Sequence, residues 1–169
     1  MKKMSSQKGA AVVEFAVLAL LLLVFVFGII EFGFLWLQSH YIGNAVREGA
    51  RVASKTADVD PSGPTLNNSS EVETAVQEAI KEYLEGAVVY SSTHVNDCCD
   101  SGNLIFIETP SLETITGSTT PGIRVSLTVQ TAEIWEPVLW ELLNLLPGSN
   151  LGEVRQIRQT ALFPVIHNN

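Results

Sequence analysis

Residues 10–37 read AAVVEFAVLALLLLVFVFGIIEFGFLWL, and Glu14 and Glu31 are the two charged residues in this stretch. The uninterrupted apolar run from Phe15 to Ile30 has 16 residues. Such a run gives roughly 24 Å of helix, whereas the bilayer core is roughly 30 Å thick. A helix that crosses the core must therefore extend back to Ala10 or forward past Glu31. The sequence predicts a membrane-spanning helix with a carboxylate inside the membrane or at its edge.

If the membrane-spanning helix extends back to Ala10, Glu14 is the carboxylate that enters the membrane or lies at its edge. A charged side chain in a bilayer costs about 2.5–3.5 kcal/mol on insertion scales, so it usually has a partner. Ala10 lies one helical turn before Glu14 on the same face, and cleavage after Gly9 would give it an ammonium group. Three interpretations stay open: Glu14 lies in interfacial water, it stays protonated, or it pairs with a new amino terminus at Ala10.

The basic residues Lys2, Lys3 and Lys8 precede the apolar stretch, as in a secretory signal. The stretch is long, however, and no small-x-small cleavage site follows it, so we expect the helix to remain in the mature protein. No Lys or Arg occurs in the fifteen residues after Ile30. Because basic residues close to a span favour the cytoplasmic side, the pattern predicts a cytoplasmic N-terminus and an extracytoplasmic C-terminal part.

The charge balance of the whole chain excludes one broad class of function. Its 169 residues include 18 acidic and 10 basic ones, which gives a formal net charge of -8. A nucleic-acid-binding protein needs a basic surface to neutralise phosphates, so this balance disfavours that class.

Three short blocks of sequence carry a family resemblance. Lys8 and Gly9 followed by AAVVEF resemble the processing site of type IV pilin-like precursors, in which a prepilin peptidase cuts after the glycine and glutamate is the fifth mature residue. Together with blocks at 28–33 and 44–51, this site makes residues 8–54 resemble the TadE-like family of tight-adherence (Flp) pilus assembly proteins. The matched family positions are Phe15, Glu31, Phe32, Gly33, Asn44, Ala45, Arg47, Glu48, Gly49, Ala50 and Arg51.

The resemblance implies a structural protein rather than an enzyme, namely a minor pseudopilin cleaved between Gly9 and Ala10. It implies that Glu14 pairs with the freed amine of its own or a neighbouring chain and sets the register between helices. The implied partners are membrane lipid, a prepilin peptidase, other pilin-like subunits and the pilus assembly machinery, with no nucleic acid. The implied location is the bacterial inner membrane, crossed once, with a part in cell adhesion through the surface pilus.

The chain divides into four segments: a leader at 1–9, a long helix at 10–54, a linker at 55–70 and an extracytoplasmic α+β domain at 71–169. The linker reads KTADVDPSGPTLNNSS, a cluster of turn-forming residues. Arg47 and Arg51 lie one turn apart on the long helix, beyond the apolar stretch. They either form a solvated helix face or contact phospholipid head groups, or they pack against the globular part or a pilus partner.

The C-terminal segment predicts a mixture of helix and strand. Ser70 and Glu73 form a capping-box pattern before an amphipathic helix that Gly86 ends. The apolar stripe of this helix comprises Val72, Val76, Ile80 and Tyr83 or Leu84. Strands are expected at 87–95, 104–108, 123–130 and 153–165, and a short helix with two tryptophans at 134–146. We therefore expect an α+β fold: a long N-terminal helix, then an antiparallel sheet with one or two short helices.

The sequence lacks the motifs of common active sites. It has no phosphate-binding glycine loop, no G-x-S-x-G and no H-E-x-x-H. His40, His94 and His167 fall in separate segments without a second His or Cys at metal-ligand spacing. We expect no catalytic residue, no metal and no cofactor.

Cys98 and Cys99 are the two cysteines of the chain and are adjacent. Outside the cytoplasm they can be oxidised, but neighbouring Cα atoms lie about 3.8 Å apart, below the usual disulfide range of roughly 4.4–6.8 Å. Three interpretations stay open: a vicinal disulfide that locks a loop tip, two free thiols, or an intermolecular link.

Two functions from different classes compete. The first is the pilin-like structural subunit. The second is a static single-pass anchor for an extracytoplasmic binding module or adhesin that is neither processed nor assembled. Glu14 discriminates between them, because a plain anchor gives this carboxylate no role.

Overall fold

The computed structural model describes residues 5–60, 62–63, 65–87, 95, 98–99, 103–118, 120–130 and 156–166. The chain forms two compact units, one of Met1–Trp36 with Glu136–Leu151 and the other of Leu37–Trp135 with Gly152–Asn169. The described residues of the first unit are all helical and start at Ser5. The second unit contains a helix pair and a sheet.

Helix α1 spans Ser5–Thr56 and has 52 residues. No proline interrupts it, and its apolar stretch is rich in Leu and Ala, which favour helix. The helix expected at 10–54 is therefore confirmed, and the helical backbone also includes residues 5–9, which the sequence assigns to the leader. The division of the chain at residues 9, 54 and 70 stays a prediction.

A compact connection joins α1 to α2, which spans Ser69–Glu85. Within it, Val59 and Leu66 form an antiparallel bridge. Asn68 links both sides: its Nδ2 donates to the Thr56 carbonyl at 2.8 Å, and its Oδ1 accepts from the Asp58 N–H at 2.9 Å. These bonds fix the return of the chain, so that α2 packs against the second half of α1.

The apolar stripe predicted for α2 is confirmed, because Val72, Val76, Ile80 and Leu84 are its fully buried residues. The predicted capping box is wrong: the cap residue is Asn68, and it makes no side-chain capping bond. Its amide is already bonded to Thr56 and Asp58, and Ser70 lies inside the helix. The helix does stop at Gly86, but with φ −76° rather than in the left-handed conformation.

The four-stranded sheet has the order β1-β2-β3-β4, with β1 Cys98–Cys99, β2 Ile105–Thr114, β3 Pro121–Gln130 and β4 Gln156–Pro164. The pairs β2–β3 and β3–β4 are antiparallel as expected, whereas the short β1 runs parallel to β2. The predicted α+β class is confirmed. The strand expected at 87–95 and the helix expected at 134–146 fall almost entirely outside the described residues.

The strand expected at 104–108 continues to Thr114, because Pro110 does not end it. The register between β2 and β3 shifts between Glu108 and Ser111, and Pro110 lies within this irregularity. Proline has no N–H to donate, so an irregular position is where a strand tolerates it.

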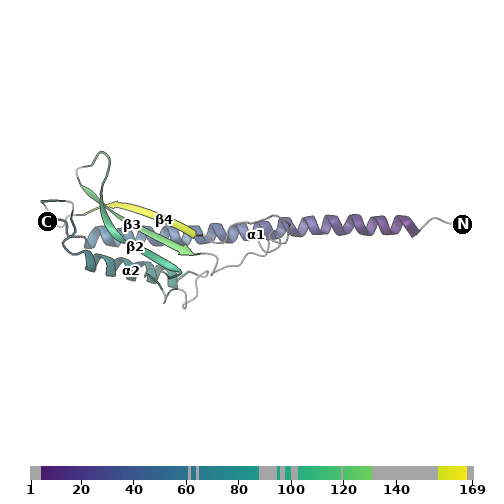
Figure 1. The fold of residues 1–169 in the computed structure, drawn as a ribbon, viewed down its shortest axis with the longest axis horizontal. Coiled ribbons are helices and arrows are strands. Elements are labelled where there is room, and N and C mark those ends of the chain that lie inside the picture. The colour runs from purple at the N-terminus through teal and green to yellow at the C-terminus, as the bar shows by residue number, and fades with distance from the viewer. Residues whose placement is uncertain are drawn as a thin grey trace. The chain divides into compact units, whose positions relative to one another are not determined.

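Helices α1 and α2 lie on the same face of the sheet (Figure 1). The inward-facing residues of β3 are fully buried, namely Ile123, Val125, Leu127 and Val129. The far end of α1 is tied to the last strand, because Ser54 Oγ donates to the Pro164 carbonyl and the Ile166 N–H donates to the Ser54 carbonyl at 3.1 Å. The core of the second unit therefore lies between the two helices and the sheet.

Candidate functional site

The first half of α1 presents an almost continuous apolar surface. Between residues 10 and 37, large side chains such as Phe15, Ile29 and Phe32 are each more than 70% exposed. The helix is long and apolar enough to cross a membrane. Exposed apolar surface of this extent is unfavourable in water, so the molecule needs lipid or other helices around this half.

Gly9, Ala10 and Glu14 lie on this exposed part of α1, where the sequence predicts processing and amine pairing. Nothing lies within 4 Å of a Cβ built at Gly9, so the backbone is open there. Among the described residues, no cation forms an ion pair with Glu14. The site is thus accessible, and its carboxylate has no described salt-bridge partner within the single chain.

The second family block, at 28–33, lies on the same helix. Phe32 and Gly33 are exposed, and space is open around Gly33, whereas Glu31 is half-buried. This block therefore adds to the exposed apolar surface.

The third family block, at 44–51, has a different environment. Its small residues Ala45, Gly49 and Ala50 are buried. A Cβ added at Gly49 would lie 2.9 Å from Cδ1 and Cγ1 of Ile80, so the absence of a side chain lets α1 approach α2 closely. Gly49 is thus a contact residue between the two helices, and Ala45 and Ala50 belong to the buried core.

The polar residues of the same block point outward. Asn44, Arg47 and Arg51 are exposed. Arg51 binds Glu48 on its own helix in a bidentate pair, in which Nε donates to Oε2 at 2.8 Å and Nη2 donates to Oε1. Neither arginine side chain is buried in this domain, and contact with phospholipid head groups or with a pilus partner stays a prediction.

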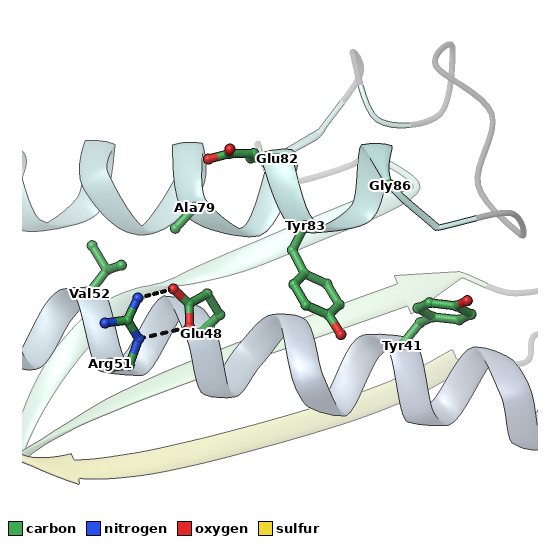
Figure 2. A pocket seen from close by; sticks show the side chains of 8 residues that line it. All are labelled: Tyr41, Glu48, Arg51, Val52, Ala79, Glu82, Tyr83 and Gly86. Atoms are coloured by element: carbon green, nitrogen blue, oxygen red, sulfur yellow. Dashed lines mark hydrogen bonds and ion pairs between the residues drawn. The ribbon is translucent and has the colours of Figure 1, made fainter.

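A groove of about 730 Å³ runs between α1 and α2 (Figure 2). Helix α1 contributes Tyr41, Glu48, Arg51 and Val52. Helix α2 and its cap contribute Ala79, Glu82, Tyr83 and Gly86. Two tyrosine rings and two small apolar residues thus line a groove with charged groups from both helices.

This groove could not be read from the sequence, because its walls are about thirty residues apart in the chain. One signal for the underlying contact is present: Ala45, Gly49 and Ala53 repeat a small residue every fourth position, a spacing that lets helices approach closely.

Cys98 and Cys99 form a vicinal disulfide, one of the three possibilities that the sequence leaves open. Cys99 adopts φ 98°, in the left-handed region that is uncommon for residues with a side chain. The pair forms the short edge strand β1, with Cys99 buried in the core. The disulfide therefore lies at the edge of the sheet, in the strand that pairs with β2.

The described residues contain no group of three or more His, Cys, Asp or Glu side chains that could hold a metal ion. His40 is exposed on α1, while His94 and His167 lie outside the described residues.

Among the described residues, these features define a class of protein in which an apolar helix that is long enough to cross a membrane is joined to a small α+β domain. Within that class, residues 9–51 match the family model described as TadE-like protein. The match confirms the resemblance carried by the three sequence blocks, and it connects the chain with a structural, pilus-associated family. No curated protein and no solved structure matches the chain.

Proposed function

We propose that this protein is a pilin-like subunit of a tight-adherence pilus, held by residues 10–37 in the bacterial inner membrane until it is assembled. Its N-terminus then lies in the cytoplasm and its α+β domain outside. The observation that carries the proposal is the carboxylate of Glu14, which is exposed on the apolar first half of α1, one turn from Ala10, and has no ion-pair partner among the described residues.

A prepilin peptidase would hydrolyse the peptide bond between Gly9 and Ala10. Water adds across that bond, leaving a carboxylate on Gly9 and an amine on Ala10, which is largely protonated at neutral pH. The ammonium group then neutralises Glu14 of its own or a neighbouring chain. This pairing offsets the cost of about 2.5–3.5 kcal/mol for an isolated charge in the membrane.

The exposed apolar side chains have one contact surface in the membrane and another in the pilus. In the precursor they contact lipid, and in the pilus they contact the equivalent helices of neighbouring subunits. Because lipid and helix surfaces are similarly apolar, this exchange needs polar pairs to fix the register, and Glu14 supplies one.

The first experiment is to measure the intact mass and N-terminal residue of the protein extracted from its native membrane. We expect a chain that starts at Ala10 and is lighter by residues 1–9. A chain that starts at Met1 would contradict the proposal and favour the static anchor for an adhesin.

The second experiment replaces the carboxylate. Glu14→Leu and Glu14→Gln should both leave the protein in the membrane and abolish its assembly, since each removes the partner of the amine. Val17→Leu, on the same exposed surface, is the matched control and should assemble normally. Normal piliation with Glu14→Leu would rule out the pairing.

A further inference from the structure

The edge of the sheet at β1 consists of two adjacent residues that are bonded to each other. Cys98 and Cys99 make up the whole of β1, and they pair in parallel with Ile105 and Phe106 of β2. Their Cα atoms lie 3.7 Å apart. Disulfides usually join Cα atoms that are about 4.4–6.8 Å apart, so the backbone has to adapt to this bridge. The disulfide and the edge strand are therefore one structural element.

Cys99 has a backbone conformation that residues with a side chain seldom adopt. Among the described residues, it is the one residue other than glycine with a positive φ, which is 98°. Crowding around Cβ makes this region unfavourable for every residue except glycine. Such a conformation persists only where the surrounding structure imposes it. The two constraints available here are the bond to Cys98 and the burial of the Cys99 side chain, which is 8% exposed.

Of these two constraints, the disulfide is the one that requires the unusual φ. In a regular strand, consecutive side chains point to opposite faces of the sheet, so the two sulfur atoms could not meet. The bond therefore exists only with a distorted backbone at this position. Burial of Cys99, in contrast, is compatible with the negative φ of an ordinary strand. Once the bond is broken, a φ of 98° has no remaining cause.

We propose that the bond between Cys98 and Cys99 is a redox switch for the edge of the sheet. While the bond is intact, β1 stays paired with β2. When a dithiol reduces the bond, Cys99 relaxes to a negative φ and β1 leaves β2. This inference goes beyond the proposed function and does not depend on it, because it concerns the folded domain and not the processing of the N-terminus.

The chemistry is thiol–disulfide exchange with the dithiol. A thiolate of the dithiol attacks Sγ of Cys98, which is half-buried and therefore more accessible than Cys99. The bond between the two sulfur atoms breaks, and Cys99 leaves as a thiolate that takes up a proton. The second thiol of the dithiol then displaces Cys98, which also takes up a proton, and the dithiol becomes a disulfide. In total, two electrons and two protons pass from the dithiol to the chain.

The backbone groups of β2 report the release of β1 residue by residue. The Gln130 N–H donates to the Leu104 carbonyl at 2.9 Å, so the backbone groups of Leu104 point toward β3. Successive residues of a strand direct these groups to opposite sides. Those of Phe106 therefore also point toward β3, whereas those of Ile105 and Ile107 point toward β1. Release of β1 should change the amide exchange of Ile105 and Ile107 but not that of Phe106.

The test is amide hydrogen exchange of the full-length protein in detergent micelles, measured by NMR before and after reduction with dithiothreitol. Titration of two free thiols per chain confirms the reduction, since the chain has no other cysteine. The amides of Ile105 and Ile107 should then exchange about tenfold faster, because the constraint on an unusual φ is lost. Phe106 and the amides that join β3 to β4 should keep their rates. Unchanged rates at Ile105 and Ile107, or equal acceleration throughout the sheet, would overturn the proposal.

Two variants and a reoxidation test the role of the bond itself. Cys98→Ser with Cys99→Ser should reproduce the fast exchange without any reductant. Cys98→Ser with Cys99→Gly should restore slow exchange in part, because glycine adopts a positive φ at no steric cost. Reoxidation of the reduced wild-type chain with oxidised glutathione should return the original rates. A double-serine variant that exchanges slowly, a glycine variant as fast as the double-serine one, or rates that stay fast after reoxidation would each refute the switch.

Discussion

The two halves of α1 have the same helical backbone but lie in different environments. In residues 10–37 large apolar side chains extend in every direction and stay exposed. In residues 42–53 the small residues Ala45, Ala50 and Ala53 are buried, whereas the charged residues Arg47 and Arg51 are exposed. Helical structure alone therefore says little about the environment of a segment; the size and distribution of its side chains decide it.

The largest difference between the two halves should appear in the free energy of unfolding when a large apolar side chain is shortened. Ile80→Ala, which empties the contact opposite Gly49, should lower the free energy of unfolding by about 2–5 kcal/mol. Ile29→Ala removes the same atoms from a side chain that is 72% exposed and should change it little. Urea unfolding of the full-length protein in detergent, followed by near-UV circular dichroism, measures both. Equal losses would contradict the assignment of a packed and an unpacked half.

A smaller loss of stability should follow when a side chain is added at a glycine of the packed half. Gly49→Val pushes a side chain against Ile80, where even a Cβ would approach to 2.9 Å, and should cost about 1–3 kcal/mol. Gly33→Val is the matched control, since nothing lies within 4 Å of its Cβ position and the helical backbone is the same. Thermal unfolding of the two variants compares them directly. If Gly49→Val is as stable as Gly33→Val, the close approach of α1 and α2 is refuted.

The smallest effect concerns the connection that lets α2 return to the packed half of α1. Hydrogen bonds from the hydroxyl and the backbone N–H of Ser62 hold the pKa of Asp60 below its ordinary value of 3.8. The folded state binds this proton less tightly than the unfolded chain. The contribution of Asp60 to stability is therefore present above the unfolded pKa and is lost as the pH falls through the folded pKa.

An NMR titration of the Asp60 carboxyl group should find this low pKa, and Ser62→Ala should raise it, because the hydroxyl donor is gone. An Asp60 pKa that does not respond to Ser62→Ala would exclude the hydroxyl as its cause.

The sequence predicts those parts of the structure in which periodicity and burial agree. The stripe of α2 and the alternation of β3 are such cases, because one face of each element is fully buried. Family resemblance predicts the positions of Gly9 and Glu14 but gives no environment for Arg47 or Gly49. Their environments depend on α2, whose return along α1 is fixed in part by the bonds of Asn68.

Two predictions from the sequence are wrong for similar physical reasons: the capping box of α2 and the end of the strand expected at 104–108. Ser70 and Glu73 offer a local capping pattern, but the helix begins earlier, because Asn68 is already held by the end of α1 and by Asp58. Pro110 is typical of a strand end, yet the irregular register between Glu108 and Ser111 accommodates it inside β2. In both cases a non-local contact overrides the local pattern.

The tie between Ser54 and Pro164 has a consequence for biogenesis. The two residues are 110 positions apart, and a ribosome needs about 5–20 s to synthesise that length. Until then the second half of α1 has no final strand to pack against, whereas residues 10–37 are complete and ready to enter the membrane. Insertion is thus separated from domain closure in time, and a nascent chain that stops before Gln156 is left anchored with its core open.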